Sequence, residues 1–185
     1  MAPARIAADM GQRILRHPFN PASYTPAGRA IAASLDLFEH TTRRYGKPAF
    51  DLPVTEIDGK TVTIVEELHA RKNFGQLRHF RRALKGASAH KDDPRVLVVA
   101  PMSGHHATLL RDTVRTLLPD HDVYITDWRD ARNVPVYEGL FDLDDYIDYV
   151  IEWLEFLGPN THVIAVCQPS VPVLAAVSLM AAKDH

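Results

Sequence analysis

The sequence predicts an α/β protein with a mostly parallel β-sheet, flanking helices and an N-terminal β-hairpin. Three short apolar segments, at residues 96–100, 122–126 and 162–166, have the β-branched composition of buried strands. A helical pattern follows each of them along the chain. Such an alternation of strands and helices is typical of parallel sheets with right-handed crossover connections.

The composition is that of an ordinary globular domain. The chain has 185 residues, of which 46% are hydrophobic and 24% are charged, and its formal net charge is −2. It contains no apolar run of about 18 residues and no pattern typical of a secretory leader. A single cysteine forms no internal disulfide, which favours a reducing compartment, and no Cys/His spacing is typical of zinc. We therefore expect no transmembrane segment, no nucleic-acid partner, no cofactor and no metal, and the oligomeric state stays open.

Residues 1–53 are predicted to form an N-terminal helical extension. Prolines interrupt its first half, and apolar residues then recur at helical spacing between Ile31 and Thr42. Residues 1–15 combine arginines with apolar side chains. They form either an amphipathic helix that lies on a surface or partner, or a terminal helix that frays.

Residues 54–185 are predicted to form the domain that contains the sheet. It begins with a hairpin, because an Asp-Gly pair separates two β-rich segments, residues 54–57 and 61–65. Residues 71–95 are polar and basic, and we expect a solvated connector there that is helical near residues 77–84. The alternative is a basic surface that contacts an anionic partner.

Three helices are predicted to flank the sheet. The first covers residues 108–118, with leucines and valines on one side. The second begins at Asp142 or Asp144, whose carboxylate caps the first turn, and ends before Gly158. The third covers residues 173–182.

The only cysteine, Cys167, lies where the third strand pattern stops and the last helix is about to begin. A nucleophile requires such a strand–turn–helix corner, because the turn lifts its side chain above the sheet edge and the helix N-terminus favours a thiolate. Chemistry gathers at the carboxyl ends of parallel strands, so the loops at residues 101–106 and 127–135 are expected beside it. The alternative is that Cys167 is a small, buried and inert hydrophobic residue.

The loops at this edge supply further candidate residues. The backbone N–H of Gln168 and that of Met102 or Ser103 are predicted to form an oxyanion hole. Asp127 and Arg129 end the second strand, and they either form a salt bridge or take part in catalysis.

Aromatic residues and histidines near these loops are candidates for substrate contacts. His105 and His106 either orient their loop and contact the substrate, or act as the base. Trp128 is a candidate for substrate binding in an apolar groove, together with Tyr137 and Phe141. The alternative is that these three aromatic residues belong to the core.

Taken together, these segments resemble intracellular polyhydroxyalkanoate (polyhydroxybutyrate) depolymerases of the α/β-hydrolase superfamily. The resemblance is carried by residues 100–105, 124–128 and 166–172, and it covers the chain from about Tyr24 onward. It implies that Cys167 is the nucleophile at a position where most α/β-hydrolases have serine. It also implies a cytoplasmic bacterial enzyme that acts at the surface of polyhydroxyalkanoate granules.

The corner departs from the general Gly-x-Ser-x-Gly pattern of hydrolases. Ala165 and Pro169 replace the two glycines: alanine is small enough for the tight turn, and proline suits the first turn of a helix. The resemblance places the triad acid and histidine after the nucleophile, beyond His185. We therefore expect the first half of an α/β-hydrolase, incomplete at the C-terminus and inactive alone.

Two enzymatic functions and one non-catalytic function follow from these features. The first is hydrolysis of polyester ester bonds, which gives hydroxyacid oligomers or monomers. The second is acyl transfer, as in polyhydroxyalkanoate synthases. Those enzymes have a Gly-x-Cys-x-Gly pattern at the corner, and Gln168 and Pro169 argue against it here. The third is a non-catalytic, granule-associated protein.

Overall fold

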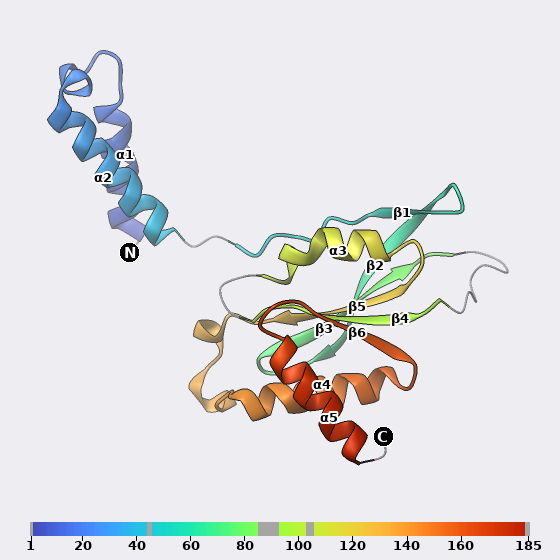
Figure 1. Ribbon diagram of the computed structural model, residues 1–185. Coiled ribbons are helices and arrows are strands. Elements are labelled where there is room, and N and C mark those ends of the chain that lie inside the picture. The colour runs from blue at the N-terminus through green and yellow to red at the C-terminus, as the bar shows by residue number, and fades with distance from the viewer. Residues whose placement is uncertain (1, 44–45, 85–92, 103–105, 184–185) are drawn as a thin grey trace. The chain divides into compact units, whose positions relative to one another are not determined.

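The computed structural model describes residues 2–43, 46–84, 93–102 and 106–183. It divides the chain into two compact units, Met1–Lys47 and Pro48–His185 (Figure 1).

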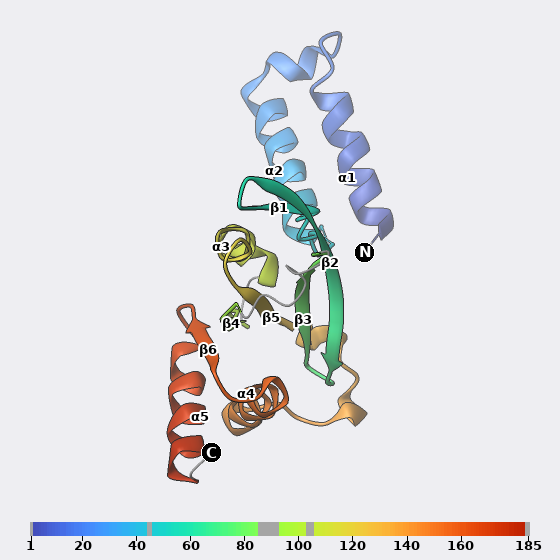
Figure 2. The same cartoon turned by 90° about the vertical axis from the view of Figure 1, so that its right-hand side faces the viewer.

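The first unit is a pair of helices that lie side by side, α1 (Ala2–Leu15) and α2 (Pro26–Thr42) (Figure 2). A short 3-10 turn, η1 (Pro21–Tyr24), belongs to the connection between them. The buried residues Ala8 and Ala32 are both small, which allows the two helix backbones to approach closely.

Polar contacts also join the two helices. Arg16 Nη2 lies 3.0 Å from Asp36 Oδ2, and this ion pair links the end of α1 to the middle of α2. The predicted N-terminal helix is therefore packed along α2, while its apolar residues Ile6, Met10 and Ile14 remain exposed.

The second unit contains a six-stranded mixed sheet in the order β1-β2-β3-β5-β4-β6. Its strands are β1 (Val54–Ile57), β2 (Lys60–Arg71), β3 (Gly75–Arg82), β4 (Arg95–Val99), β5 (Asp122–Trp128) and β6 (Thr161–Ala165). The pairs β4–β5 and β4–β6 are parallel, whereas β1–β2, β2–β3 and β3–β5 are antiparallel. The predicted hairpin and the three predicted strands are confirmed, but the expectation of a mostly parallel sheet is wrong.

Strand β3 accounts for much of this difference, because the sequence predicts a connector, helical in part, over these residues. Leu77 and Phe80 are buried in the cores on opposite faces of the sheet, as the alternation of a strand requires. Between them, Arg78 Nε lies 2.5 Å from Asp127 Oδ2 on the neighbouring strand. The basic residues of this segment are thus neutralised by carboxylates that are distant in the sequence, so their charge does not mark a solvated connector.

Helices cover both faces of the sheet (Figure 1). α3 (Arg111–Leu117) lies on one face and is preceded by the 3-10 turn η3 (Ala107–Leu110). α4 (Leu143–Leu157) and α5 (Ser170–Ala182) lie on the other face. All three predicted helices are therefore confirmed, and the last begins three residues earlier than expected.

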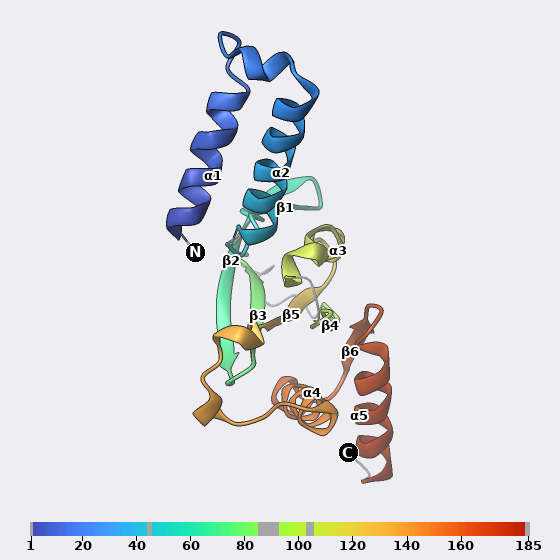
Figure 3. The ribbon, with the colours of Figure 1, turned by 90° about the vertical axis from the view of Figure 1, so that its left-hand side faces the viewer.

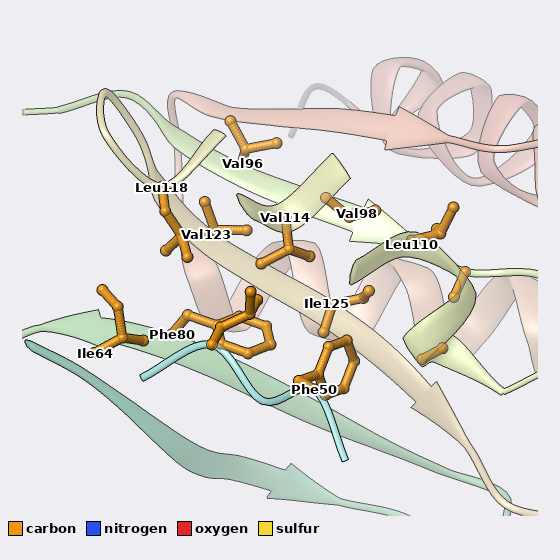
Figure 4. Packing of buried hydrophobic residues seen from close by; sticks show 13 residues of the cluster. Phe50, Ile64, Phe80, Val96, Val98, Leu110, Val114, Leu118, Val123 and Ile125 are labelled. Carbon is orange, nitrogen blue, oxygen red and sulfur yellow. The ribbon is translucent and has the colours of Figure 1, made fainter. Parts of the chain in front are cut away.

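Strand β4 separates the two hydrophobic cores. Val96 and Val98 point into the core beneath α3, where Phe80 and Phe50 also pack with their ring centroids 5.0 Å apart (Figure 4). The alternate residues Leu97 and Val99 point into the core beneath α4 and α5. Burial on both faces explains the uninterrupted apolar sequence of this strand.

Helix α4 begins at a capping box. Asp142 Oδ1 accepts hydrogen bonds from the backbone N–H groups of Asp144 and Asp145, at 2.9 and 3.1 Å. Asp145 Oδ2 in turn accepts the N–H of Asp142 at 2.9 Å. The helix ends at Gly158, whose φ of 83° lies in the region that favours glycine. Of the two predicted caps, Asp142 is confirmed.

Candidate functional site

Cys167 occupies a tight corner between β6 and α5. Its φ of 67° is in the left-handed region, which a residue with a Cβ adopts at a cost of about 1–2 kcal/mol. Ser170 closes the turn, because both its backbone N–H and its hydroxyl donate to the Cys167 carbonyl oxygen, at 3.1 and 2.6 Å. Cys167 itself is exposed. The corner therefore presents the cysteine to solvent at the carboxyl end of β6.

The loop after β4 is tied directly to this corner. The backbone N–H of Met102 donates to Gln168 Oε1 at 3.0 Å, across 66 positions of the sequence. The structure thus brings together Met102 and Gln168, two of the residues predicted to form the oxyanion hole. The Met102 N–H points at a side-chain oxygen in this state, and it becomes available to an oxyanion only if that amide turns away. Ser103 and His105 lie outside the described residues.

His106, at the start of η3, lies near the loop that follows β5. Its charge is one of the influences that lower the pKa of the Asp130 carboxyl, after the larger effect of the hydrogen bonds from Arg132. His106 is exposed to solvent.

Trp128 is a core residue, which corrects its prediction as a substrate-binding residue. Only 7% of it is exposed, and its Nε1 donates to the Ala100 carbonyl oxygen at 2.8 Å. Its indole packs against Tyr146 and Trp153, with ring centroids 4.4 and 5.4 Å away. An aromatic residue at the end of a strand has the same sequence pattern whether it faces a groove or a helix, and here α4 covers it.

The other two aromatic candidates differ from each other. Phe141 is partly buried and packs on Phe74 and Tyr149, whereas 88% of Tyr137 is exposed. Both belong to the connection between β5 and α4, which passes the turn between β2 and β3 (Figure 3). Asn73 in that turn donates to the Glu138 carbonyl oxygen at 3.0 Å and holds the connection in place.

Asp127 and Arg129 both have partners in the fold, which favours the salt-bridge interpretation. Asp127 is 1% exposed and pairs with Arg78 of β3. Burial lowers the pKa of Arg78, but Asp127 and Glu66 raise it by more, so the guanidinium stays charged. Arg129 Nη1 lies 3.1 Å from Glu138 Oε2.

A second group of chemically active side chains lies away from Cys167. Glu67, His69 and His79 have their potential ligand atoms close together on β2 and β3. Sequence analysis does not find this group, because its members become neighbours only when β2 pairs with β3. The one sign of this group in the sequence is the pair His69 and His79, which lie ten residues apart in a segment where polar and apolar residues alternate.

Within the part of the chain that the structure describes, no helix combines the length and the apolarity needed to cross a bilayer. Comparisons of the chain with protein-family models, with curated proteins and with solved structures find no significant match.

Proposed function

We propose that this protein is an ester hydrolase of the α/β-hydrolase class that acts on intracellular polyhydroxyalkanoate, with Cys167 as its nucleophile. The observation that carries the proposal is the conformation of the corner. An exposed cysteine with a φ of 67° stands between a parallel strand and a helix N-terminus. Strained backbone at a reactive side chain is typical of functional sites, and an inert surface cysteine has no need of it.

The sheet supports the same proposal. β4, β5 and β6 run parallel, so the loops that follow them leave the sheet at one edge. The contact between Met102 and Gln168 shows that two of these loops meet beside Cys167. Of the five strands from β2 to β6, four run in one direction and β3 alone runs in the other, which is compatible with the first half of an α/β-hydrolase.

The proposed chemistry begins with attack of the Cys167 thiolate on an ester carbonyl carbon. The negative charge that develops on the carbonyl oxygen is stabilised by backbone N–H groups of the corner and of the loop after β4. Collapse of the tetrahedral intermediate breaks the C–O bond and leaves a thioester on Cys167. The departing alkoxide takes a proton from a general acid, and water then hydrolyses the thioester to a free hydroxyacid end.

An activated ester tests the first step, because p-nitrophenolate leaves without a general acid. We expect p-nitrophenyl butyrate to release about one equivalent of p-nitrophenolate per chain in a rapid phase and to leave a butyryl group on Cys167. Mass spectrometry identifies the site without ambiguity, since the chain has only one cysteine. The Cys167→Ala variant should show neither the rapid phase nor the adduct.

Two outcomes would contradict the proposal. One is a rapid phase of equal size in Cys167→Ala, and the other is no acylation of the wild-type chain under conditions in which iodoacetamide alkylates Cys167. Circular dichroism of both proteins controls for folding. Incubation with a hydroxyacyl-CoA distinguishes the alternative function, because an acyltransferase would form polymer whereas a hydrolase would release hydroxyacid.

A further inference from the structure

Strands β2 and β3 place three potential metal ligands on one face of the sheet. Glu67 and His79 are direct partners across the two strands. The pairing then shifts, because Leu68 pairs with Arg78 and Ala70 pairs with Leu77, which leaves His69 as the extra residue of a β-bulge. A bulge turns the side chain of its extra residue, and here the His69 ring meets that of His79 edge to face, with centroids 4.8 Å apart.

The potential ligand atoms converge on a single carboxylate oxygen. Glu67 Oε2 lies 3.4 Å from His69 Nε2 and 3.9 Å from His79 Nδ1, and all three atoms are within 4.8 Å of one another. Ligand atoms bound to a tetrahedral zinc ion are about 3.3 Å apart, given bonds of about 2.0–2.1 Å. Small side-chain rotations therefore suffice to bring the three atoms to coordinating distance.

His79 is the strongest indication of a ligand-binding site. It is 6% exposed, and its Nδ1 is a buried nitrogen with no hydrogen-bond partner among the residues that the structure describes. Its other nitrogen, Nε2, lies 2.6 Å from Asp122 Oδ1. In the tautomer whose Nε2–H donates to that carboxylate, the lone pair is on Nδ1, the nitrogen that faces Glu67 and His69. A carboxylate behind a histidine is the usual support of a metal-binding imidazole.

The surroundings hold the carboxylate and one imidazole in place. Arg81 Nε donates to Glu67 Oε1 at 2.6 Å. This bond leaves Oε2 to face the two imidazoles. The ring of Tyr124 stacks on that of His79, with centroids 4.2 Å apart.

We propose that Glu67, His69 and His79 bind a divalent transition-metal cation of the Zn²⁺ type, with Asp122 as the residue that positions His79. Two imidazole nitrogens and one carboxylate oxygen suit zinc and its neighbours in the first transition row rather than Mg²⁺ or Ca²⁺, which prefer oxygen ligands. His69 is exposed, so the site is open to solvent on that side and a water molecule can complete the coordination.

The site lies at the opposite end of the sheet from Cys167. His79 pairs with Tyr124 near the start of β5, and Asp122 is the first residue of that strand. Cys167 follows the carboxyl end of β6 instead. The metal would therefore fasten the bulge of β2 to β3 and take no part in ester hydrolysis.

The test is titration of the whole chain with Zn²⁺ by isothermal titration calorimetry, with Co²⁺ absorption to report tetrahedral coordination. We expect about one equivalent to bind and the visible Co²⁺ bands to appear. His69→Ala should weaken binding at least about tenfold, and Asp122→Asn should weaken it about 10–100-fold. His69 is exposed in a bulge, so its replacement should leave the fold intact, as circular dichroism will check.

His162→Ala is the matched control, because His162 is an exposed histidine on strand β6. It should bind Zn²⁺ as the wild type does. The proposal would be overturned if the wild-type chain bound no Zn²⁺, or if His69→Ala and His162→Ala bound it equally. Retained binding by Cys167→Ala would show that the result does not depend on the proposed nucleophile.

Discussion

At the scale of the residue, the backbone of Cys167 is the feature that most needs an explanation. Three other non-glycine residues in the described chain have a positive φ, namely Asp51, Asp58 and Asn160. Those are residue types whose short polar side chains tolerate the left-handed region, whereas cysteine has no such compensation. The fold therefore stores strain at the one side chain that can act as a strong nucleophile.

This strain predicts a trade-off between stability and reactivity at position 167. Cys167→Gly should be more stable than Cys167→Ala by roughly 0.5 kcal/mol, because relief of about 1–2 kcal/mol outweighs the greater chain entropy of unfolded glycine. Neither variant should be acylated by the activated ester. Urea unfolding of the two variants measures the difference, and a lower midpoint for Cys167→Gly than for Cys167→Ala would contradict the strain at the corner.

At the scale of the element, α4 is determined largely by its own sequence. The capping box at Asp142 and Asp145 satisfies backbone N–H groups at the N-terminus, and Gly158 ends the last turn. The stripe that includes Tyr146, Val150 and Trp153 is buried against the sheet. Start and stop are both visible in the sequence, which is why the bounds of this helix are predicted so closely.

The cap predicts a measurable loss of stability when it is removed. Asp142→Ala should lower the free energy of unfolding by about 1 kcal/mol, because it removes the acceptor for two backbone N–H groups. Asp148→Ala is the matched control, since Asp148 is exposed in the same helix beyond the first turn. Chemical denaturation compares the two, and equal losses would contradict a specific role of the cap.

At the scale of the whole molecule, the chain consists of two units with very different cores. Both hydrophobic clusters of the second unit are built from residues that follow Lys47, and they include Phe50 and Leu52 from the end of the predicted extension. The buried residues of the helical pair are small, with Ala8, Gly28 and Ala32 among them. Burial of so little apolar surface stabilises a structure only weakly.

Residues 48–185 should therefore fold without the helical pair. We expect the shortened chain to unfold cooperatively, with a free energy of unfolding within about 0.5 kcal/mol of that of the same unit in the full chain. A peptide of residues 1–47 should unfold at a lower urea concentration than residues 48–185, because its buried residues are small. Circular dichroism and urea titration check both, and loss of cooperative unfolding in residues 48–185 would refute the independence of the second unit.

Local sequence patterns predict most of the helices and strands. They fail where the structure of a segment depends on contacts with residues that are distant in the sequence. The apolar strands, the hairpin and the capped helix follow from hydrophobic periodicity and turn chemistry. Strand β3 does not, because its arginines mimic a solvated connector until Asp127 and the β2 carboxylates neutralise them. Trp128 is likewise assigned to the core only by the position of α4.

The sequence alone determined the alternation of strands and helices and the position of Cys167 at a corner, because both depend on residues that are neighbours along the chain. The tertiary structure decided the direction of β3, the burial of Trp128 and the contact between Met102 and Gln168. It also decided the grouping of His69 and His79 with Glu67 through a bulge in strand pairing. These features depend on strand register, which is set by how whole elements pack and is not encoded in any one segment.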